Sequence, residues 1–206
     1  MKVLGTIARE GVDMKKFCDI SGWQVYMDWD RLSEEFDGVI IKIGQGHRLD
    51  DMFISHVNNA VKYNMPYGVY YYSTASNEQE AIEEAEQVDA WLKEYLRGEN
   101  PEYGIWYDVE DKKIPTWNVT NITTAFINNL WEKGYNYVGV YSSYSWFTNY
   151  FDHDVIKDVA IWCAQYYVQN DLKLEHPDWH IKLWQYSDCY SDEFPYDANI
   201  YYEEGE

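Results

Sequence analysis

The sequence predicts an α/β protein, built as an irregular, reduced (β/α) TIM-like barrel with helices missing in its last third. Eight short runs of apolar, β-branched or aromatic residues recur along the 206 residues, and each has the length of a strand. Helical periodicity fills the early intervals, and such alternation is typical of a parallel sheet covered by helices. The later intervals shorten, and residues 165–180 show little helical periodicity. About eight strands indicate a closed barrel, although the chain is short for a (β/α)₈ fold.

Local patterns define each element in turn. Gly38, Gly68 and Gly104 introduce three of the strand-like runs. Asn77 is a residue type that caps helix N-termini, and Gly134 is a typical residue just beyond a helix C-terminus. The expected strands are residues 17–20, 39–43, 69–72, 105–109, 138–141, 159–164, 181–186 and, more weakly, 198–201; the expected helices are residues 51–63, 77–96 and 120–133.

The chain is expected to form one domain, residues 17–206, preceded by an N-terminal extension of residues 1–16. No linker rich in Pro, Gly or Ser divides the sequence, and no internal repeat is visible. Met14, Lys15 and Lys16 directly precede the first strand, so the residues before it look like an addition to a complete domain. An extra strand or hairpin is the packing we consider for residues 1–13.

Charge and hydropathy exclude several classes of protein. The chain carries 16 Lys and Arg against 36 Asp and Glu, a formal net charge of -20. We therefore expect no nucleic-acid partner, because such binding requires basic residues that neutralise phosphates, and no anionic membrane surface. No apolar run approaches the roughly 18 residues of a membrane span. Arg9, Glu10 and Asp13 stand where a Sec signal would be apolar, so no such signal is recognised.

Cysteine and histidine spacing predicts no metal site. The three cysteines are scattered, and Cys18 and Cys163 lie in apolar strand-like runs where buried free thiols are expected. Pro177 breaks any helix between His176 and His180, which argues against a zinc site there. His56 is expected on the surface of a helix.

The aromatic composition is biased toward rings with a polar edge. The sequence has 10 Trp and 21 Tyr but only 7 Phe. The flat face of a pyranose packs on such rings, while the hydroxyl or indole N–H can bond sugar oxygens. Most of these residues must also fill the core, so composition alone favours a carbohydrate ligand only weakly.

One pair of carboxylates ends the fourth expected strand. Side chains alternate along a strand, so Asp108 and Glu110 project to the same face, roughly 6–7 Å apart along the backbone. Two carboxylates this close repel each other, and the pKa of one should rise until it is an acid at neutral pH. Glycoside hydrolysis needs such a pairing of a proton donor with an anion. Taken alone, such a pair is more often a solvated strand end or a cation site than a catalytic pair.

Other residues are expected at the same rim, where the active sites of (β/α) barrels lie. Asp19 ends the first strand and Asp197 begins the last, so both could face the central pair. Aromatic residues at strand ends could build walls around these carboxylates; they are Tyr70, Tyr71, Tyr72, Tyr141, Trp184 and Tyr186, with Gln185 among them. An acidic floor with aromatic walls suits a polysaccharide cleft.

From about Phe17 to Tyr201 the sequence resembles the glycoside hydrolase family 25 lysozymes, which are N-acetylmuramidases. Each matching piece is short, and it is their order and spacing that are specific. The pieces are Asp19-Ile20-Ser21, residues 39–46, Asp51-Met52-Phe53, the aromatic third strand, Asp108-Val109-Glu110, Tyr141-Ser142, Trp162-Cys163-Ala164-Gln165-Tyr166, Trp184-Gln185-Tyr186-Ser187 and Asp197-Ala198-Asn199. Departures include Lys42, where an Arg-containing variant is frequent, and Ala198, where an aliphatic residue is more usual.

The resemblance implies cleavage of the β-1,4 bond between N-acetylmuramic acid and N-acetylglucosamine in peptidoglycan. Glu110 is then the general acid, and Asp108 is its partner, acting as a nucleophile or orienting a substrate N-acetyl group. Asp19 and Asp197 are flanking carboxylates that tune this pair. The expected substrate-binding residues are Tyr70, Tyr72, Tyr141, Trp184 and Gln185. The family implies no metal and no organic cofactor, and we expect a monomer.

Two other functions stay open at this point. The chain could be a non-catalytic peptidoglycan-binding or glycan-binding module on the same fold, or a hydrolase of chitin-like chains. Retention of all four carboxylates argues against the first, and the absence of a long Asp-x-x-Asp-x-Asp-x-Glu signature argues against the second. Without a recognised signal, the expected location is the cytoplasm until release, as for a phage-type endolysin, or export by another route, with action at the cell wall.

Overall fold

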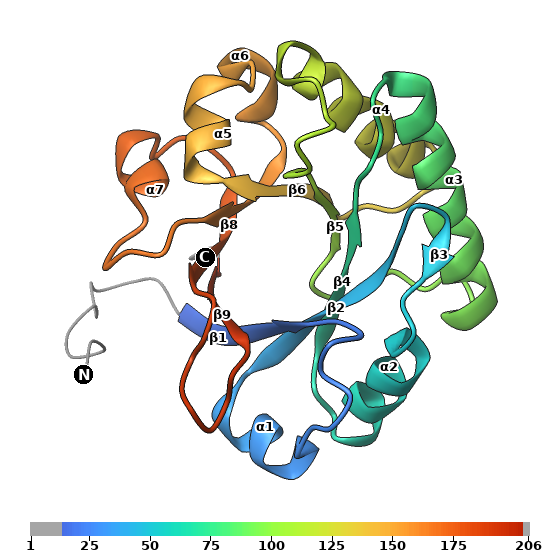
Figure 1. The fold of residues 1–206 in the computed structure, drawn as a ribbon, viewed down its shortest axis with the longest axis vertical. Coiled ribbons are helices and arrows are strands. Elements are labelled where there is room, and N and C mark those ends of the chain that lie inside the picture. The colour runs from blue at the N-terminus through green and yellow to red at the C-terminus, as the bar shows by residue number, and fades with distance from the viewer. Residues whose placement is uncertain (1–13, 204–206) are drawn as a thin grey trace.

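The computed structural model describes residues 14–203, which form a closed barrel of eight strands surrounded by helices (Figure 1). The barrel closes because β1 pairs with both β2 and β9. Its strands are β1 (Met14–Ile20), β2 (Gly38–Gln45), β4 (Tyr67–Tyr72), β5 (Ile105–Asp108), β6 (Val138–Ser143), β7 (Ala160–Ala164), β8 (Ile181–Ser187) and β9 (Asp197–Tyr202). A two-residue strand, β3 (Arg48–Leu49), folds back on β2. All eight expected strands are present, and the predicted irregular barrel is confirmed.

The strand directions are parallel except at one place. β9 runs antiparallel to both of its neighbours, β1 and β8, whereas the other adjacent strands of the barrel are parallel. The connection from β8 to β9 is consequently a long hairpin rather than a helical crossover. This reversal brings the first residue of β9, Asp197, to the rim where the parallel strands end.

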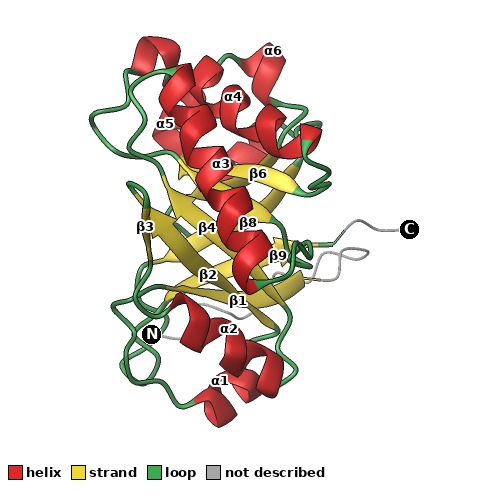
Figure 2. Ribbon diagram, turned by 90° about the vertical axis from the view of Figure 1, so that its right-hand side faces the viewer, coloured by secondary structure: helices red, strands yellow, loops and turns green. Residues whose placement is uncertain are grey.

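Helices cover the outside of the barrel (Figure 2), and those that follow β6 in the chain are short. The three expected helices are α2 (Phe53–Lys62), α3 (Glu78–Tyr95) and α4 (Val119–Glu132). The others are α1 (Trp29–Glu35), α5 (Tyr144–Asn149), α6 (His153–Ile156), α7 (Asp171–Glu175) and the 3₁₀ turn η1 (Thr116–Asn118). The last third therefore keeps three helices of 4 to 6 residues, and α7 lies in the stretch without helical periodicity. Helices this short bury too few residues to produce a periodic pattern.

Large aromatic side chains fill the barrel interior. Trp106 and Trp162 are fully buried there, with ring centroids 5.9 Å apart. Phe17, Ile40 and Leu183 pack in the same cluster. A separate and larger cluster lies between the sheet and the surrounding helices. The interior is therefore a packed core, which leaves only the rim open for chemistry.

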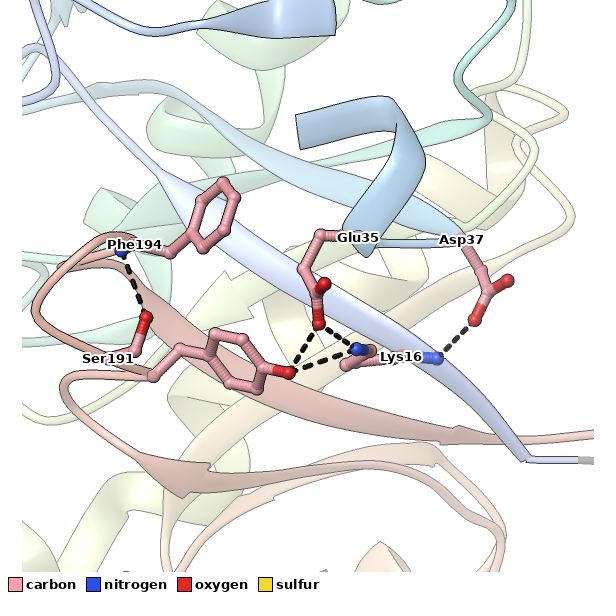
Figure 3. A network of polar contacts seen from close by, with 6 residues as sticks. Lys16, Glu35, Asp37, Ser191 and Phe194 are labelled. Carbon is pink, nitrogen blue, oxygen red and sulfur yellow. Dashed lines mark hydrogen bonds and ion pairs between the residues drawn. The ribbon is translucent and has the colours of Figure 1, made fainter. Parts of the chain in front are cut away.

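The hairpin between β8 and β9 covers the outer face of β1, beside α1. Tyr190 and Phe194 pack on Phe36, with ring centroids 5.1 and 6.0 Å away. The Lys16 ammonium contacts the Glu35 carboxylate and donates to the Tyr190 hydroxyl at 3.0 Å, which ties the hairpin to both elements (Figure 3). Aromatic packing and a partly exposed ion pair thus hold the hairpin where a helix would otherwise cover the strand.

The first strand begins earlier than the sequence indicated. Met14, Lys15 and Lys16 pair with β9, opposite Tyr202, Tyr201 and Ile200 respectively. These three residues therefore extend the sheet, although they fall in the N-terminal extension expected from the sequence. The extra strand or hairpin considered for residues 1–13 lies outside the described residues.

Gly139 leaves the room that the central indole needs. A Cβ at this position on β6 would lie 2.5 Å from Cζ3 of Trp106 and 2.6 Å from the Ala160 carbonyl oxygen. Because one of these neighbours is backbone, rotation of a side chain cannot relieve the overlap. Gly139→Ala should therefore lower the free energy of unfolding by about 1–3 kcal/mol. Thermal unfolding measures the change as a loss of roughly 2–4 °C per kcal/mol, and an unaltered melting temperature would contradict the packing described here.

Candidate active site

Four carboxylates gather at the rim formed by the carboxyl ends of the parallel strands. Side chains alternate along each strand, so Asp19 lies two residues beyond Phe17 of the interior core, and Asp108 two beyond Trp106. Glu110 follows Asp108 with the same spacing. Asp197 reaches this rim from the antiparallel strand and stands directly opposite Asp19 in the register. The structure thus brings together all four carboxylates that the sequence pointed to.

Asp19 and Asp197 form a hydrogen-bonded acid pair. A side-chain hydrogen bond joins the two groups, and the Asn199 amide donates to Asp19 at 2.8 Å. Burial raises the pKa of Asp19, although the donors around it favour its ionised form. Burial and the nearby charge of Asp19 raise the pKa of Asp197 to about 8. At neutral pH, Asp197 therefore keeps its proton and donates a hydrogen bond to the Asp19 carboxylate.

Gln185 is the centre of a network beneath this pair. Its Nε2 donates to Asp19 at 3.0 Å and to Asp197 at 3.3 Å. Its Oε1 accepts from the hydroxyls of Tyr141 and Tyr166 at 2.9 and 3.1 Å. Only 2% of Gln185 is exposed. The hydrogen-bonding groups of the amide are therefore all used by protein groups, and these contacts hold the carboxylates in place. The expected contact of Gln185 with substrate stays a prediction.

Asp108 is buried at the mouth of the barrel. It is 5% exposed, and its Oδ1 has no hydrogen-bond partner within residues 14–203. Burial, followed by the neighbouring Glu110 charge, raises its pKa well above the ordinary value, while the Lys42 charge opposes the shift. An unpartnered acceptor in a desolvated position is costly in the free protein, and a donor from a bound ligand would relieve that cost.

Glu110 differs from Asp108 in reaching solvent. The residue between them, Val109, is fully buried; its N–H donates to the Tyr141 carbonyl at 2.8 Å, and its own carbonyl accepts from Ser142 Oγ at 2.6 Å. These bonds fix the backbone beyond the end of β5, so that Asp108 and Glu110 project on the same side of the chain. Partial burial at the rim, then the charge of Asp19, raises the pKa of Glu110. Glu110 is thus an exposed carboxyl group whose protonated form is favoured.

Lys42, like Asn199 and Tyr166 of the network around Gln185, is a site residue that is not among those expected from the sequence. It lies on β2, two residues beyond Ile40 of the interior core, and its Nζ is 5.0 Å from the centre of the Tyr72 ring. Burial lowers its pKa, whereas the charges of Asp108, Asp50 and Glu110 favour the ammonium. The same alternation that placed Asp19 and Asp108 at the rim would have found Lys42 from the sequence.

Tyrosines form walls around the carboxylates, but the wall position expected for Tyr71 is wrong, because its ring is fully buried on the outer side of the sheet, where it stacks on Phe126. Tyr70 packs edge-on against Trp162, with centroids 6.1 Å apart, and burial followed by the charges of Asp19 and Asp108 raises its pKa well above 10. Tyr72 donates to Asp111 at 3.4 Å, and Tyr141 is 8% exposed.

Trp184 occupies a different position from these tyrosines. It precedes Gln185 on β8, so the two side chains leave opposite faces of the strand. Its indole N–H donates to the Gln165 carbonyl at 2.8 Å, and it is 6% exposed. The contacts show a role in packing, and its expected role in substrate binding stays a prediction.

Of the remaining expectations, the one for the cysteines is confirmed and the one for His56 is wrong. Cys18 and Cys163 are buried free thiols, as predicted. The surface position expected for His56 is wrong: the ring is 1% exposed, because its Nε2 reaches inward to the Ser21 carbonyl at 3.1 Å. Within the part of the chain that the structure describes, no group of His, Cys, Asp and Glu could hold a metal ion, and no helix is long and apolar enough to cross a membrane.

A barrel with paired carboxylates and aromatic walls at its carboxyl rim is typical of enzymes that hydrolyse glycosidic bonds. Comparison with known families agrees with this class. The model of the glycosyl hydrolases family 25 matches residues 18–193, and the chain belongs to this family. No curated protein sequence matches it significantly.

Solved structures share the fold. The modular autolysin LytC from Streptococcus pneumoniae, in complex with a synthetic peptidoglycan ligand, is 27% identical with a TM-score of 0.81; the match covers 97% of this chain and 48% of LytC. The chain thus spans about half the length of that relative. The catalytic domain of endolysin ply40, from bacteriophage P40 of Listeria monocytogenes, is 28% identical with a TM-score of 0.76, over 95% and 94% of the two chains. A family 25 glycosyl hydrolase from Bacillus anthracis, 21% identical with a TM-score of 0.69 over 97% and 96%, shares the fold.

The acid pair should make stability depend on pH. Because the pKa of Asp197 rises from 3.8 to about 8 on folding, the folded protein keeps a proton that the unfolded chain releases. The resulting stability is complete below about pH 4 and is lost as the pH rises through 8, by at most about 1.4 kcal/mol per pH unit. Asp197→Asn keeps an N–H donor for Asp19 but cannot titrate. Its free energy of unfolding should therefore decline less between pH 4 and 8 than that of the unchanged protein.

Chemical denaturation across this pH range measures the difference. Asp192→Asn removes an exposed carboxylate from the same β8–β9 hairpin and serves as the matched control, which should follow the unchanged protein. Parallel curves for Asp197→Asn and the unchanged protein would show that the pair does not retain the proton.

Proposed function

We propose that this protein is a muramidase, a lysozyme that hydrolyses the β-1,4 bond between N-acetylmuramic acid and N-acetylglucosamine in bacterial peptidoglycan. The observation that carries the proposal is the meeting of two acid pairs, Asp108 with Glu110 and Asp19 with Asp197, at one aromatic-walled rim. Membership of family 25 supports it. Further support comes from the likeness to LytC, whose structure holds a synthetic peptidoglycan ligand.

Glu110 has the properties of the general acid. It is exposed in the cleft, and its raised pKa favours the protonated form that must donate to the leaving oxygen. As the pH rises through this pKa, the proton is lost and turnover should decline. Lys42 and Asp19 act on Glu110 in opposite senses, since the first favours its anion and the second its acid.

Asp108 is the partner of the acid, as a nucleophile or as an acceptor that orients the substrate N-acetyl group. Its unpartnered Oδ1 supports the second role, because an N-acetyl N–H is the kind of donor that this buried oxygen lacks. A glycan whose N-acetyl groups have been removed distinguishes the roles. A direct nucleophile can still attack such a substrate, whereas neighbouring-group participation cannot occur.

Asp19 and Asp197 support the reaction as a preorganised acid pair. The network of Gln185 and Asn199 fixes Asp19, and the shared proton limits the negative charge next to Glu110. The likeness to the ply40 endolysin supports action at the bacterial cell wall, reached by endolysin-like release from the cytoplasm or by another export route. That the protein is a monomer stays a prediction.

Replacing the acid tests the proposal directly. Glu110→Gln keeps the shape of the side chain but cannot donate the proton, so hydrolysis of purified, teichoic-acid-free peptidoglycan should fall by about 10²–10⁴-fold. Mass spectrometry of the soluble products should find fragments that end in reducing N-acetylmuramic acid with the unchanged protein only. Glu102→Gln, an exposed change before the start of β5 and so at the opposite end of the barrel, is the matched control and should release the same fragments as the unchanged protein.

Each other result of this experiment has a distinct meaning. Full activity of Glu110→Gln would remove Glu110 as the acid. Sedimentation of the unchanged protein with the wall material, without any release of fragments, would indicate a binding module on the same fold. Fragments from chitin but not from peptidoglycan would indicate a hydrolase of chitin-like chains.

The net charge of -20 predicts an effect of salt on whole cells. Gram-positive walls are often anionic, and repulsion should slow the approach of an acidic enzyme. Ionic strength near 0.1–0.15 M limits such repulsion to roughly 8–10 Å. Lysis of whole cells should therefore accelerate from low to moderate salt, while hydrolysis of teichoic-acid-free peptidoglycan should change less. A flat or falling profile on whole cells would show that repulsion does not limit access.

A further inference from the structure

A concave surface lies on the outer side of the barrel, between α1 and α2. These two helices are neighbours in both ribbon views (Figures 1 and 2). The cavity has a volume of about 610 Å³, within the roughly 300–1,000 Å³ of small-molecule sites. Its walls come from residues 25–28 of the β1–α1 loop and from the two helices. None of the four catalytic carboxylates is part of it.

The cavity is structurally connected to the catalytic strand. Ser21 lies two residues beyond Asp19, and its carbonyl contacts the His56 ring of α2 at 3.1 Å. The next residue, Gly22, donates its N–H to Asp50 at 2.9 Å. The loop then continues from Asp19 into the cavity wall. The cavity extends along α2, from Met52 at the start of the helix to Tyr63 at its end.

Its surface has the chemistry of a sugar site. Tyr26 on the loop is 94% exposed and Tyr63 is partly exposed, so these two rings can face a ligand, whereas Trp29 is 7% exposed and supports Tyr63 from within the core, with centroids 6.4 Å apart and an interplanar angle of 22°. Ser55 and Asn59 of α2 add a hydroxyl and an amide. Aromatic faces beside small polar groups suit a pyranose ring, whose apolar face packs on the ring while its hydroxyls form hydrogen bonds.

His56 supplies a second and independent indication of a ligand. Since a carbonyl oxygen only accepts, the Nε2 that faces Ser21 carries the ring proton, and Nδ1 is an acceptor. This Nδ1 is buried and has no hydrogen-bond partner in the described part of the chain. Burial lowers the pKa of the ring, so it is neutral. The cavity wall therefore contains a neutral acceptor that lacks the donor which buried polar groups ordinarily have.

The charge of the residues that line the cavity limits the class of ligand it can bind. Asp28 and Asp30 contribute carboxylates to the cavity, and the described residues that line it include no Lys or Arg. An anionic wall polymer would be repelled, whereas a neutral ring rich in hydroxyl groups would find acceptors.

We propose that this cavity binds an N-acetylhexosamine ring of the glycan strand, beyond the sugars that flank the cleaved bond. The inference rests on the proposed function, because it gives the same enzyme a distal site for the same polymer. Long strands would then reach both the carboxylates and the cavity, while short fragments would reach only the carboxylates.

Binding to peptide-free glycan strands tests the site without turnover. In a Glu110→Gln background, Tyr26→Ala should weaken the affinity for long strands by roughly 2- to 10-fold, and leave that for the shortest bound fragment nearly unchanged. Ser55→Trp fills the cavity from an exposed position of α2 and should have the same selective effect. Trp131→Ala removes a half-exposed indole from the last turn of α4, at the opposite end of the barrel, and is the matched control. Circular dichroism verifies that each variant is folded.

The outcomes separate the two proposals. If the unchanged enzyme cleaves peptidoglycan but Tyr26→Ala and Ser55→Trp bind long strands as Trp131→Ala does, the distal site is wrong and the muramidase assignment stands. If no fragment is cleaved but the two variants selectively lose long strands, the site stands and the assignment fails. Loss of affinity for isolated stem peptides, with unchanged affinity for peptide-free strands, would overturn the sugar proposal in favour of a peptide site.

Discussion

The packed aromatic interior of the barrel is the constraint on which the site depends. The space enclosed by the strands is filled by Trp106, Trp162 and Phe17. Side chains further along these strands therefore cannot enter the barrel interior. The next inward-facing residues along the same strands, among them Asp19 and Asp108, must stack above this layer. There they are shielded from solvent on one side, and their ordinary acidity is suppressed. The packing of the core therefore determines how the carboxylates of the site are protonated.

Within that arrangement, the four carboxylates are made unequal by their surroundings. Asp19 receives amide donors from Gln185 and Asn199, while Asp108 keeps an oxygen without a partner. Glu110 reaches the solvent, and Asp197 retains a proton. Four acidic side chains on one rim would repel one another if all were ionised, so their differing environments are what allow them to coexist and to take different roles.

Much of this arrangement could be predicted from the sequence, because it follows from short-range rules. Alternation along a strand placed Asp108 and Glu110 on one face, and apolar runs located all eight strands of the barrel. The residues that were missed depend on tertiary context. The short helix α1 buries only Trp29 and Leu32, which is too little for a periodic pattern. His56 looked like a surface residue, because no local signal shows that Ser21 lies against it. The antiparallel direction of β9 depends on which strands it joins.

The reversal of β9 also affects how the enzyme comes into being. Asn199 and Asp19 form a hydrogen bond across 180 positions of the chain, and Asp197 stands opposite Asp19 in the same strand pair. The strand that closes the barrel is therefore also the strand that completes the acid pair. A nascent chain emerging from the ribosome contains Asp108 and Glu110 long before it contains Asp197, and pairing of β9 with β1 both closes the barrel and brings Asp197 to Asp19. Long-range strand pairing of this kind is slow to form. The closed barrel and the set of four carboxylates at its rim are therefore both incomplete until the last strand of the barrel has been synthesised and paired.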